Sequence, residues 1–340
     1  MIAPEAPIRQ AVSLRQIADE VGVSVSLVSK VLSGRMGNSG VHKSKVTAIR
    51  TKATELGYRK NLLAAALRTG RQNVLAVCVH RLGEPGSGIV EEMVAGIAAE
   101  AASCGQRLLL HYYESAGEFR AFAPELRPNA VDGVITDGLG HPELIKDLKS
   151  IHRRGLPVVT IHDEQLDPAF ANVEMNQSEL GRQATRHLLS RNCRSIAHLQ
   201  VADDSRHDGY RQALNEAGVA YREELVVDVK NYRYDAGVAG TRQLRDRGVA
   251  FDGIVGSSDH HSAATLNELV GRGWKVPEQV KLIGIDNAPI GPFAMVPLSS
   301  VSQEYAVRGR HAVRLLMATL GGQSVRSVHI NPVVISRISS

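Results

Sequence analysis

Apolar residues are spaced in two different ways along this chain, and the spacing changes near Asn73. Over residues 14–32 they recur at helical intervals, which predicts two short helices joined by a tight turn. Ala18, Gly22 and Val28 stand at the relative positions of a helix-turn-helix motif. The small side chain of Ala18 allows the helices to approach closely, and Gly22 can take the left-handed conformation that the turn requires.

The same amino-terminal segment predicts a third helix, from about residue 41 to residue 56. Ser39 is suited to cap it and Gly57 to end it, with an apolar face of Val46, Ile49, Ala53 and Leu56. The first two helices are expected to pack through Ile17, Val21, Val28 and Leu32. Residues 61–68, NLLAAALR, favour a helix too short to be stable alone, so we expect it to be ordered only by packing on a partner.

From Asn73 onward, short apolar strands alternate with amphipathic helices. This alternation predicts doubly wound parallel sheets that are covered by helices and form two subdomains. A ligand is expected between the subdomains, beyond the carboxyl ends of the strands. The expected strands are 74–79, 107–113, 131–136, 156–162, 195–201, 225–229, 253–258 and 281–286. The expected helices are 89–104, 177–191, 207–217, 235–247 and 260–272.

The fold class is therefore multidomain, with an α-helical head and an α/β body. We expect a flexible lead at 1–11, a helix-turn-helix domain at 12–58, a short helix and linker at 59–72, and an α/β domain at 73–340.

Charge is distributed unevenly between the head and the body. Residues 1–71 contain twelve Lys or Arg against four acidic residues, a net +8; since the whole chain carries +5, the remainder carries −3. A basic head on a mildly acidic body indicates that the head alone binds a polyanion. No apolar run is long enough for a membrane span or a signal core, and the three cysteines are scattered, so we expect a cytoplasmic protein.

Motifs for enzymatic chemistry are missing from the sequence. It contains no GxGxxG after a strand, no GxxxxGK[ST] and no GxSxG. The segment GSSDHH at 256–261 places Ser, Asp and His side by side, but a catalytic triad assembles through the fold rather than along the chain. We therefore expect no catalytic residues, no metal site and no cofactor.

Several blocks of the sequence carry a resemblance. The head, VSLRQIADEVGVSVSLVSKVLSG followed by ELGYRKN, and the body blocks VDGVI, GLPVV, RHDGYRQAL, GWKVPEQVKLIGIDN and PLSSV appear in a characteristic order. Over residues 12–338 the chain resembles the lactose repressor/galactose repressor (LacI/GalR) family of transcription factors. The resemblance implies a homodimer whose two heads read a pseudo-palindromic operator, a hinge helix within 59–72, and an effector-binding and dimerisation domain at 73–340. It also implies two subdomains of periplasmic-binding-protein type, the first at about 73–171 plus 302–326 and the second at about 172–301 plus 327–340.

The resemblance also implies which residues meet DNA. Val25 and Ser26 begin the recognition helix, where Val25 suits a thymine methyl group and Ser26 either kind of base. Arg15 and Lys30 suit phosphates, as do Ser13, Ser24 and Ser29, although Ser24 suits a helix cap equally well. The hinge helix would bring Asn61, Ala64 and Leu67 to the minor groove, with Leu67 inserted between base pairs. Lys60 and Ala65 depart from the family pattern there.

For the effector site, Arg206 matches the ligand-binding arginine of the family, and its planar fork suits vicinal hydroxyls or a carboxylate. Asp286 ends an apolar strand, where a carboxylate needs a partner. Tyr232 stands where the family places an aromatic beside the ligand, although it fits a packing role as well. Ser258 replaces a common asparagine. The expected effector-binding residues are Asp137, His162, Arg206, Tyr232, Asp286 and His80.

Together these features predict an effector-responsive, DNA-binding transcriptional regulator, a repressor of carbohydrate-related genes. A small ligand, a sugar or sugar derivative, would bias the orientation of the subdomains and so the pairing of the hinge helices, as inducer or as corepressor. Two alternatives stay open. One is a regulator controlled by a protein partner or without an effector, and the other, remote, is an α/β enzyme tethered to DNA.

Overall fold

The computed structural model describes residues 12–33, 42–59, 70–80, 87–137, 143–202 and 204–340. The chain divides into two compact units, residues 1–71 and residues 72–340. No helix among the described residues is long and apolar enough to cross a membrane.

The described residues of the first unit form a bundle of three helices, α1 (Leu14–Val21), α2 (Val25–Leu32) and α3 (Lys43–Glu55). Its core consists of Ile17, Ala18, Val28, Val31, Ile49 and Ala53. Gly22 takes the left-handed conformation, with φ of 68°, and joins α1 to α2 as predicted. The apolar contact between the helices differs in part from the prediction. Val31 is buried in this contact, while Val21 and Leu32 are half-buried at its edge.

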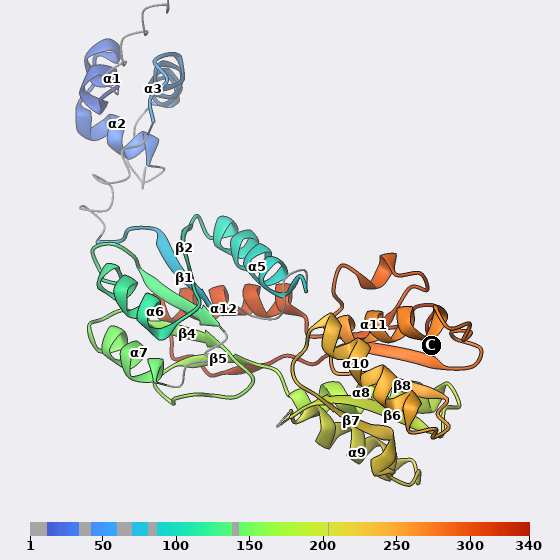
Figure 1. The fold of residues 1–340 in the computed structure, drawn as a ribbon. Coiled ribbons are helices and arrows are strands. Elements are labelled where there is room, and N and C mark those ends of the chain that lie inside the picture. The colour runs from blue at the N-terminus through green and yellow to red at the C-terminus, as the bar shows by residue number, and fades with distance from the viewer. Residues whose placement is uncertain (1–11, 34–41, 60–69, 81–86, 138–142, 203) are drawn as a thin grey trace, which may run out of the picture. The chain divides into compact units, whose positions relative to one another are not determined.

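The second unit contains two six-stranded sheets, which with their helices form the first and the second lobe (Figure 1). The first sheet has the order β11-β5-β4-β3-β1-β2 and is parallel throughout. Its strands are β1 (Val74–His80), β2 (Arg107–Tyr113), β3 (Gly133–Asp137), β4 (Val158–Ile161), β5 (Ala171–Glu174) and β11 (Val328–His329).

The second sheet has the order β12-β10-β9-β8-β6-β7 and is parallel except for β12, which runs antiparallel to β10. Its strands are β6 (Ile196–Val201), β7 (Val226–Val229), β8 (Gly253–Gly256), β9 (Lys281–Ile285), β10 (Ser299–Ser302) and β12 (Val333–Ile335). Most of these strands are apolar runs buried on both faces, because helices cover both sides of each sheet.

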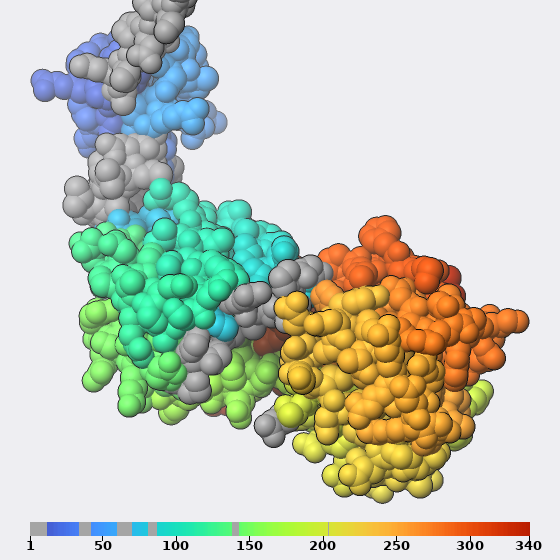
Figure 2. Space-filling view, viewed as in Figure 1, coloured from blue at the N-terminus to red at the C-terminus, as the bar shows by residue number. Residues whose placement is uncertain are grey.

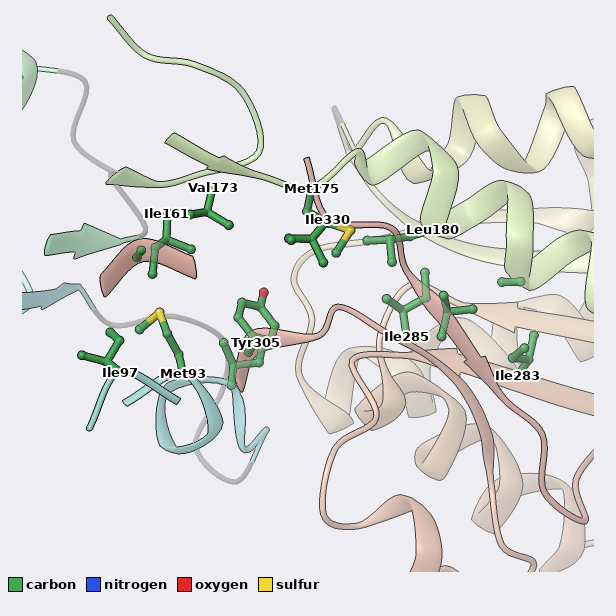
Figure 3. Close-up of a cluster of buried hydrophobic side chains, with 14 of the residues drawn as sticks. Met93, Ile97, Ile161, Val173, Met175, Leu180, Ile283, Ile285, Tyr305 and Ile330 are labelled. Atoms are coloured by element: carbon green, nitrogen blue, oxygen red, sulfur yellow. The ribbon is translucent and has the colours of Figure 1, made fainter. Parts of the chain in front are cut away.

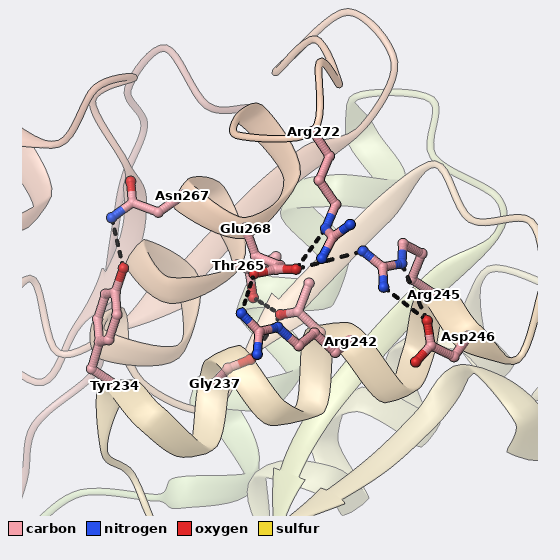
Figure 4. Close-up of polar contacts among 10 residues, drawn as sticks. Tyr234, Gly237, Arg242, Arg245, Asp246, Thr265, Asn267, Glu268 and Arg272 are labelled. Carbon is pink, nitrogen blue, oxygen red and sulfur yellow. Dashed lines mark hydrogen bonds and ion pairs between the residues drawn. The ribbon is translucent and has the colours of Figure 1, made fainter.

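Helices α5 (Ile89–Ser103) and α12 (Tyr305–Leu320) pack on one face of the first sheet, and α6 (Ala116–Phe122) and α7 (Leu144–Arg153) on the other. In the second lobe, α8 (Gln177–Ser190) and α9 (Arg206–Glu216) cover one face, and α10 (Tyr234–Asp246) and α11 (Asp259–Val270) cover the other. The outer sides of α10 and α11 are joined through Glu268, which forms ion pairs with Arg242, Arg245 and Arg272 (Figure 4).

The chain passes between the lobes three times. The first crossing follows β5, the second lies between β10 and α12, and the third lies between β11 and β12. Met175 and Ile330 lie on the first and third crossings and extend one apolar core from Val173 to Ile285 (Figure 3). The subdomain borders expected after residues 171 and 326 are therefore too early, because β5 and β11 both pair within the first sheet.

The two sheets share one strand order. In each, the first strand in sequence lies between the second and the third, so the order reverses beside β1 in the first sheet and beside β6 in the second. Ligands of doubly wound sheets bind at such a reversal, outside the carboxyl ends of the strands. This rule selects the ends of β1 and β3 in the first lobe, and of β6 and β8 in the second.

Candidate functional site

In the first unit, α2 presents several of the predicted DNA-contacting side chains to solvent. On α2, Val25 is 42% exposed, Ser26 and Lys30 are exposed as well, and Ser29 is half-buried. Arg15, on α1, is also exposed. Because the apolar side of α2 packs on α1 and α3, the side that begins with Val25 and Ser26 is free to meet a groove of DNA.

Two of the predicted phosphate contacts have a local role in this structure. The hydroxyl of Ser13 accepts a hydrogen bond of 3.1 Å from the amide of Gln16 and caps α1. Ser24 caps α2 in the same way, through the amide of Leu27 at 3.2 Å. Ser39 and the hinge residues Asn61, Ala64 and Leu67 lie outside the described residues, as do Lys60 and Ala65.

In the second lobe, Arg206 begins α9, directly after β6 at the strand-order reversal. It is only 7% exposed. Its Nε donates to Oε1 of Gln177 at 2.8 Å, and its Nη1 donates to the carbonyl oxygen of Ser257, which follows β8. The guanidinium therefore joins the ends of the two strands that the topology selects.

Asp204 and Tyr232 complete the surroundings of this guanidinium. A carboxylate oxygen of Asp204 lies 3.7 Å from Nε of Arg206 and accepts a hydrogen bond of 3.1 Å from the Tyr232 hydroxyl. The Tyr232 ring lies under the Arg206 guanidinium, 5.1 Å from its central carbon. Burial alone lowers the pKa of Arg206, but the carboxylates of Asp204 and Asp286 outweigh it and raise that pKa above its usual range.

Asp286 follows β9 and is 8% exposed. Burial raises the pKa of this carboxyl to about 6, although the neighbouring Arg206 lowers it. Its Oδ1 accepts a hydrogen bond of 2.6 Å from Nε2 of Gln303. Gln303, in turn, accepts one of 3.2 Å from Nε2 of Gln177. Two amide side chains therefore connect the predicted pair of Arg206 and Asp286.

In the first lobe, Asp137 ends β3 and is 1% exposed. Its Oδ1 accepts a hydrogen bond of 3.0 Å from the backbone amide of His80, at the end of β1. Its Oδ2 has no hydrogen-bond partner among the described residues. Burial raises the pKa of Asp137 to about 8, partly offset by the His80 amide and by the positive charge of Arg308. Both predicted residues thus occupy the strand-order reversal of this sheet.

Asp163 connects the two groups across the lobes. Its Oδ1 accepts a hydrogen bond of 2.8 Å from Nε2 of Gln177 and lies 3.9 Å from Nη2 of Arg308, a residue of α12 that is 2% exposed. In the space-filling view, the two lobes lie side by side (Figure 2). Polar side chains of both lobes are thus linked in one network.

His162 is the predicted residue that this network does not include. Its Nδ1 accepts a hydrogen bond of 3.3 Å from the amide of Glu164, in the turn that follows. Its backbone is held by Asn172, whose Oδ1 accepts from the His162 amide at 3.0 Å. The next residue, Asp163, accepts the hydrogen bond from Gln177, and a role of His162 in ligand binding stays a prediction.

Five residues of the network were missed by the sequence analysis: Asp163, Gln177, Asp204, Gln303 and Arg308. Asp204 carried a signal, because it precedes Arg206 by two residues and an acidic neighbour is needed beside a buried guanidinium. The two glutamines carried none, since an amide has no charge and no motif surrounds it. Only the approach of distant segments identifies them.

The segment GSSDHH does not form a triad. Ser258 caps α11 by accepting a hydrogen bond from the amide of His261, while the carboxylate of Asp259 accepts from Ser300 and from the amide of Ala288. His261 contacts the carbonyl oxygen of Asn231 through Nε2 at 2.8 Å. Within the described part of the chain, no group of three or more His, Cys, Asp or Glu side chains is arranged to hold a metal ion.

Comparison with known proteins agrees with this architecture. The periplasmic binding protein-like domain family matches residues 185–340. The HTH-type transcriptional regulator CelR of Thermobifida fusca is 29% identical over 338 residues, which cover 95% of this chain and 96% of CelR. Both findings agree with the resemblance of the chain to the LacI/GalR family.

Solved structures of LacI/GalR-family proteins extend the likeness over nearly the whole chain. A transcriptional regulator CelR–cellobiose complex superposes with a TM-score of 0.69 at 27% identity, covering 97% of this chain and 100% of the other. A lac repressor dimer bound to operator and the anti-inducer ONPF superposes with a TM-score of 0.77 at 18% identity, covering 97% and 99%. The chain is a DNA-binding transcriptional regulator.

Proposed function

We propose that this protein is a repressor whose affinity for operator DNA is controlled by a sugar bound between the two lobes. The observation that carries the proposal is the buried Arg206 at the strand-order reversal, with Tyr232 at its face and Asp286 nearby. Burying an arginine and a carboxylate is costly unless both have partners. Buried charged side chains that are held together at the ends of strands therefore support a ligand-binding site here.

The chemistry of these side chains favours a polyhydroxylated ligand. An arginine fork and a carboxylate bind adjacent hydroxyl groups in pairs, and the Tyr232 ring offers an apolar face to the C–H side of a sugar. Asp137 contributes a carboxylate oxygen that has no hydrogen-bond partner among the described residues, so the first lobe can form a hydrogen bond with the ligand as well. The similar structure with cellobiose supports this ligand class.

The first unit supplies the DNA contact. Val25 and Ser26 would read base edges while Arg15 and Lys30 position the head on phosphates. We further propose that the protein acts as a homodimer in the cytoplasm, with each head on one half of a pseudo-palindromic operator. The lac repressor dimer bound to operator, which shares the fold, supports this arrangement.

Control by a sugar requires that the sugar bind one arrangement of the lobes more tightly than another. The network through Gln177 and Asp163 offers such a difference, because a ligand that engages Arg206 competes with the hydrogen bond from its Nε to Gln177. Operator and sugar must then change each other's affinity by the same factor.

A thermal-shift experiment on the full chain tests the sugar proposal. We expect one or more members of a panel that contains cellobiose, ribose, gluconate and galactose to raise the melting temperature. At about 100 times its dissociation constant a ligand adds about 2.7 kcal/mol to the stability of the state that binds it. Operator affinity, measured on DNA selected from a random duplex library, should change when the same sugar is added.

Arg206→Ala should abolish the shift, because the ligand loses its charged fork. Arg211→Ala is the matched control, since Arg211 lies on the same helix but stacks on Tyr221, away from the network. A panel without any shift, or a shift that survives in Arg206→Ala, would contradict the assignment of the sugar to this site.

A further inference from the structure

Asp286 has a backbone conformation that few residues with side chains adopt. Its φ is 114°, and the next residue, Asn287, has a φ of 59°. Positive φ brings Cβ against the residue's own backbone, so such a conformation persists only where surrounding contacts hold it. The loop 286–288 therefore needs support that its own sequence does not supply.

The buried carboxylate of Asp259 provides part of that support. Asp259 is 0% exposed. Its Oδ2 accepts a hydrogen bond of 2.6 Å from the amide of Ala288, and its Oδ1 accepts one of 2.7 Å from the hydroxyl of Ser300. That hydroxyl oxygen also accepts a hydrogen bond of 2.9 Å from the amide of Asn287. Two successive backbone amides of the loop are thus directed toward one buried carboxylate and its serine.

Arg337 supplies the other part from the end of the chain, just after β12. Its Nη2 donates to Oδ1 of Asn287 at 2.6 Å, and its Nη1 donates to the carbonyl oxygen of Leu298 at 2.7 Å. Its own backbone amide is fixed by the hydroxyl of Ser299 at 2.8 Å. The guanidinium therefore ties the side chain of Asn287 to the strand that follows the loop.

Neither Asp259 nor Arg337 makes a hydrogen bond to Arg206, Tyr232 or Gln303 among the described residues, so their hydrogen bonds reach the effector site through the loop. We propose that Asp259 and Arg337 are positioning residues that hold the loop 286–288 so that the Asp286 carboxylate faces Gln303 and the Arg206 guanidinium. This inference rests on the proposed function of that site.

Side-chain support of this kind is what fixes a binding group within the narrow limits that recognition requires. Without it, the loop would relax toward negative φ, and the Asp286 carboxylate would leave the hydrogen bond from Gln303. The sugar would then lose an oriented acceptor, while the head and its DNA contacts would keep their structure.

Amide hydrogen exchange on the full chain tests the support directly and needs no ligand. In Arg337→Met, we expect the amides of residues 286–288, 290 and 291 to exchange about tenfold faster, because opening the loop no longer breaks a charged hydrogen bond. Arg191→Met is the matched control, since Nη2 of Arg191 donates to Ser336 in the same carboxyl-terminal segment without touching the loop. That variant should exchange as the wild type does.

Cellobiose is the probe for the effect on binding, measured by calorimetry with the same three proteins. We expect its dissociation constant to rise about tenfold in Arg337→Met, in line with the loss of one well-oriented hydrogen bond to a charged group. Affinity for selected operator DNA in the absence of sugar should stay unchanged. If Arg337 had a merely structural role, Arg337→Met would lower the melting temperature without changing the affinity for cellobiose separately from the affinity for operator DNA.

Asp259→Asn serves if Arg337→Met does not fold, because it keeps the side-chain size but can turn an amide donor toward the amide of Ala288. The proposal is overturned if the loop exchanges at the wild-type rate in both variants, or if it opens and cellobiose binds as before. If wild-type protein does not bind cellobiose, that result counts against the proposed sugar class, and the exchange rates alone decide whether Arg337 holds the loop.

Discussion

Asp137 shows how one side chain can make stability depend on pH. It is 1% exposed, and burial raises its pKa to about 8, well above the value of about 3.9 for an unfolded aspartate. Between these two values the folded protein binds a proton that the unfolded chain releases. Stability contributed by this residue is therefore fully present below about pH 4 and is lost as the pH rises toward 8.

The free energy of unfolding of Asp137→Asn should accordingly increase, relative to that of wild type, as the pH rises. From pH 5 to pH 8 we expect the difference in free energy of unfolding to move in favour of the variant by about 1 kcal/mol or more. Scanning calorimetry of the full chain at both pH values measures it. Asp167→Asn is the control, because the hydrogen bond from Lys149 lowers the pKa of Asp167 and its contribution is lost only in more acidic solution. Parallel pH profiles for Asp137→Asn and wild type would contradict the prediction.

At the scale of elements, the crossing of α8 and α9 decides where Arg206 stands. A Cβ on Gly181 would lie 1.9 Å from the carbonyl oxygen of Arg206, and one on Gly209 would lie 1.7 Å from that of Ser178. The two helices therefore approach until their backbones touch, which only glycine allows. This contact fixes the first turn of α9 on α8, next to Gln177.

Gly181→Ala should displace α9. We expect this displacement to reduce the affinity for the sugar more than it reduces the stability of the fold. Overpacking of this kind costs about 1 to 3 kcal/mol, and here the displaced atom belongs to the backbone of Arg206 itself. Melting temperature and cellobiose affinity measure the two effects. Gly117→Ala, on α6, is the control, because its nearest neighbouring atom, Oγ of Ser115, is 3.7 Å away. Equal cellobiose affinity in wild type and Gly181→Ala would refute this account.

At the scale of the whole molecule, the two units have separate cores. The first unit depends on six buried apolar residues, Ile17, Ala18, Val28, Val31, Ile49 and Ala53, whereas the second has three larger clusters around its sheets. A three-helix unit of this size buries little apolar surface and is only marginally stable. A substitution in the core of the first unit can therefore abolish DNA binding and leave the proposed sugar site intact.

Val28→Ala should unfold the head and leave the second unit intact. Val28 is 0% exposed, and truncating a buried valine costs about 2 kcal/mol, a large share of the stability of a small domain. Operator binding should fall sharply, while the cellobiose-induced shift of the main melting transition remains. Val25→Ala, at an exposed position of α2, should weaken DNA binding without unfolding the head. A head that stays folded in Val28→Ala would contradict the division into separate cores.

Local sequence was sufficient for the elements whose signals are short. Gly22 and Ser24 predicted the turn and the cap that the structure shows, because both depend on residues at most four positions away. The strands and helices from β1 to β9 that the apolar rhythm predicted lie within a few residues of their expected bounds. Helices α6, α7 and α12 and strands β5, β10, β11 and β12 were missing from that prediction, since their patterns are short or mixed.

The sequence alone determined the helix-turn-helix and the α/β alternation, because helix caps, periodic burial and strand ends are encoded within a few residues of each position. The resemblance of the sequence to a known family supplied the candidates Arg206 and Asp286. Only the tertiary structure decided that β11 and β12 belong to different sheets, and that Gln177, Gln303 and Asp163 join the network around Arg206. Gln177 and Gln303 are 126 positions apart, and Arg337 and Asn287 are 50. Contacts between such distant segments arise from packing, which no local pattern in the chain records.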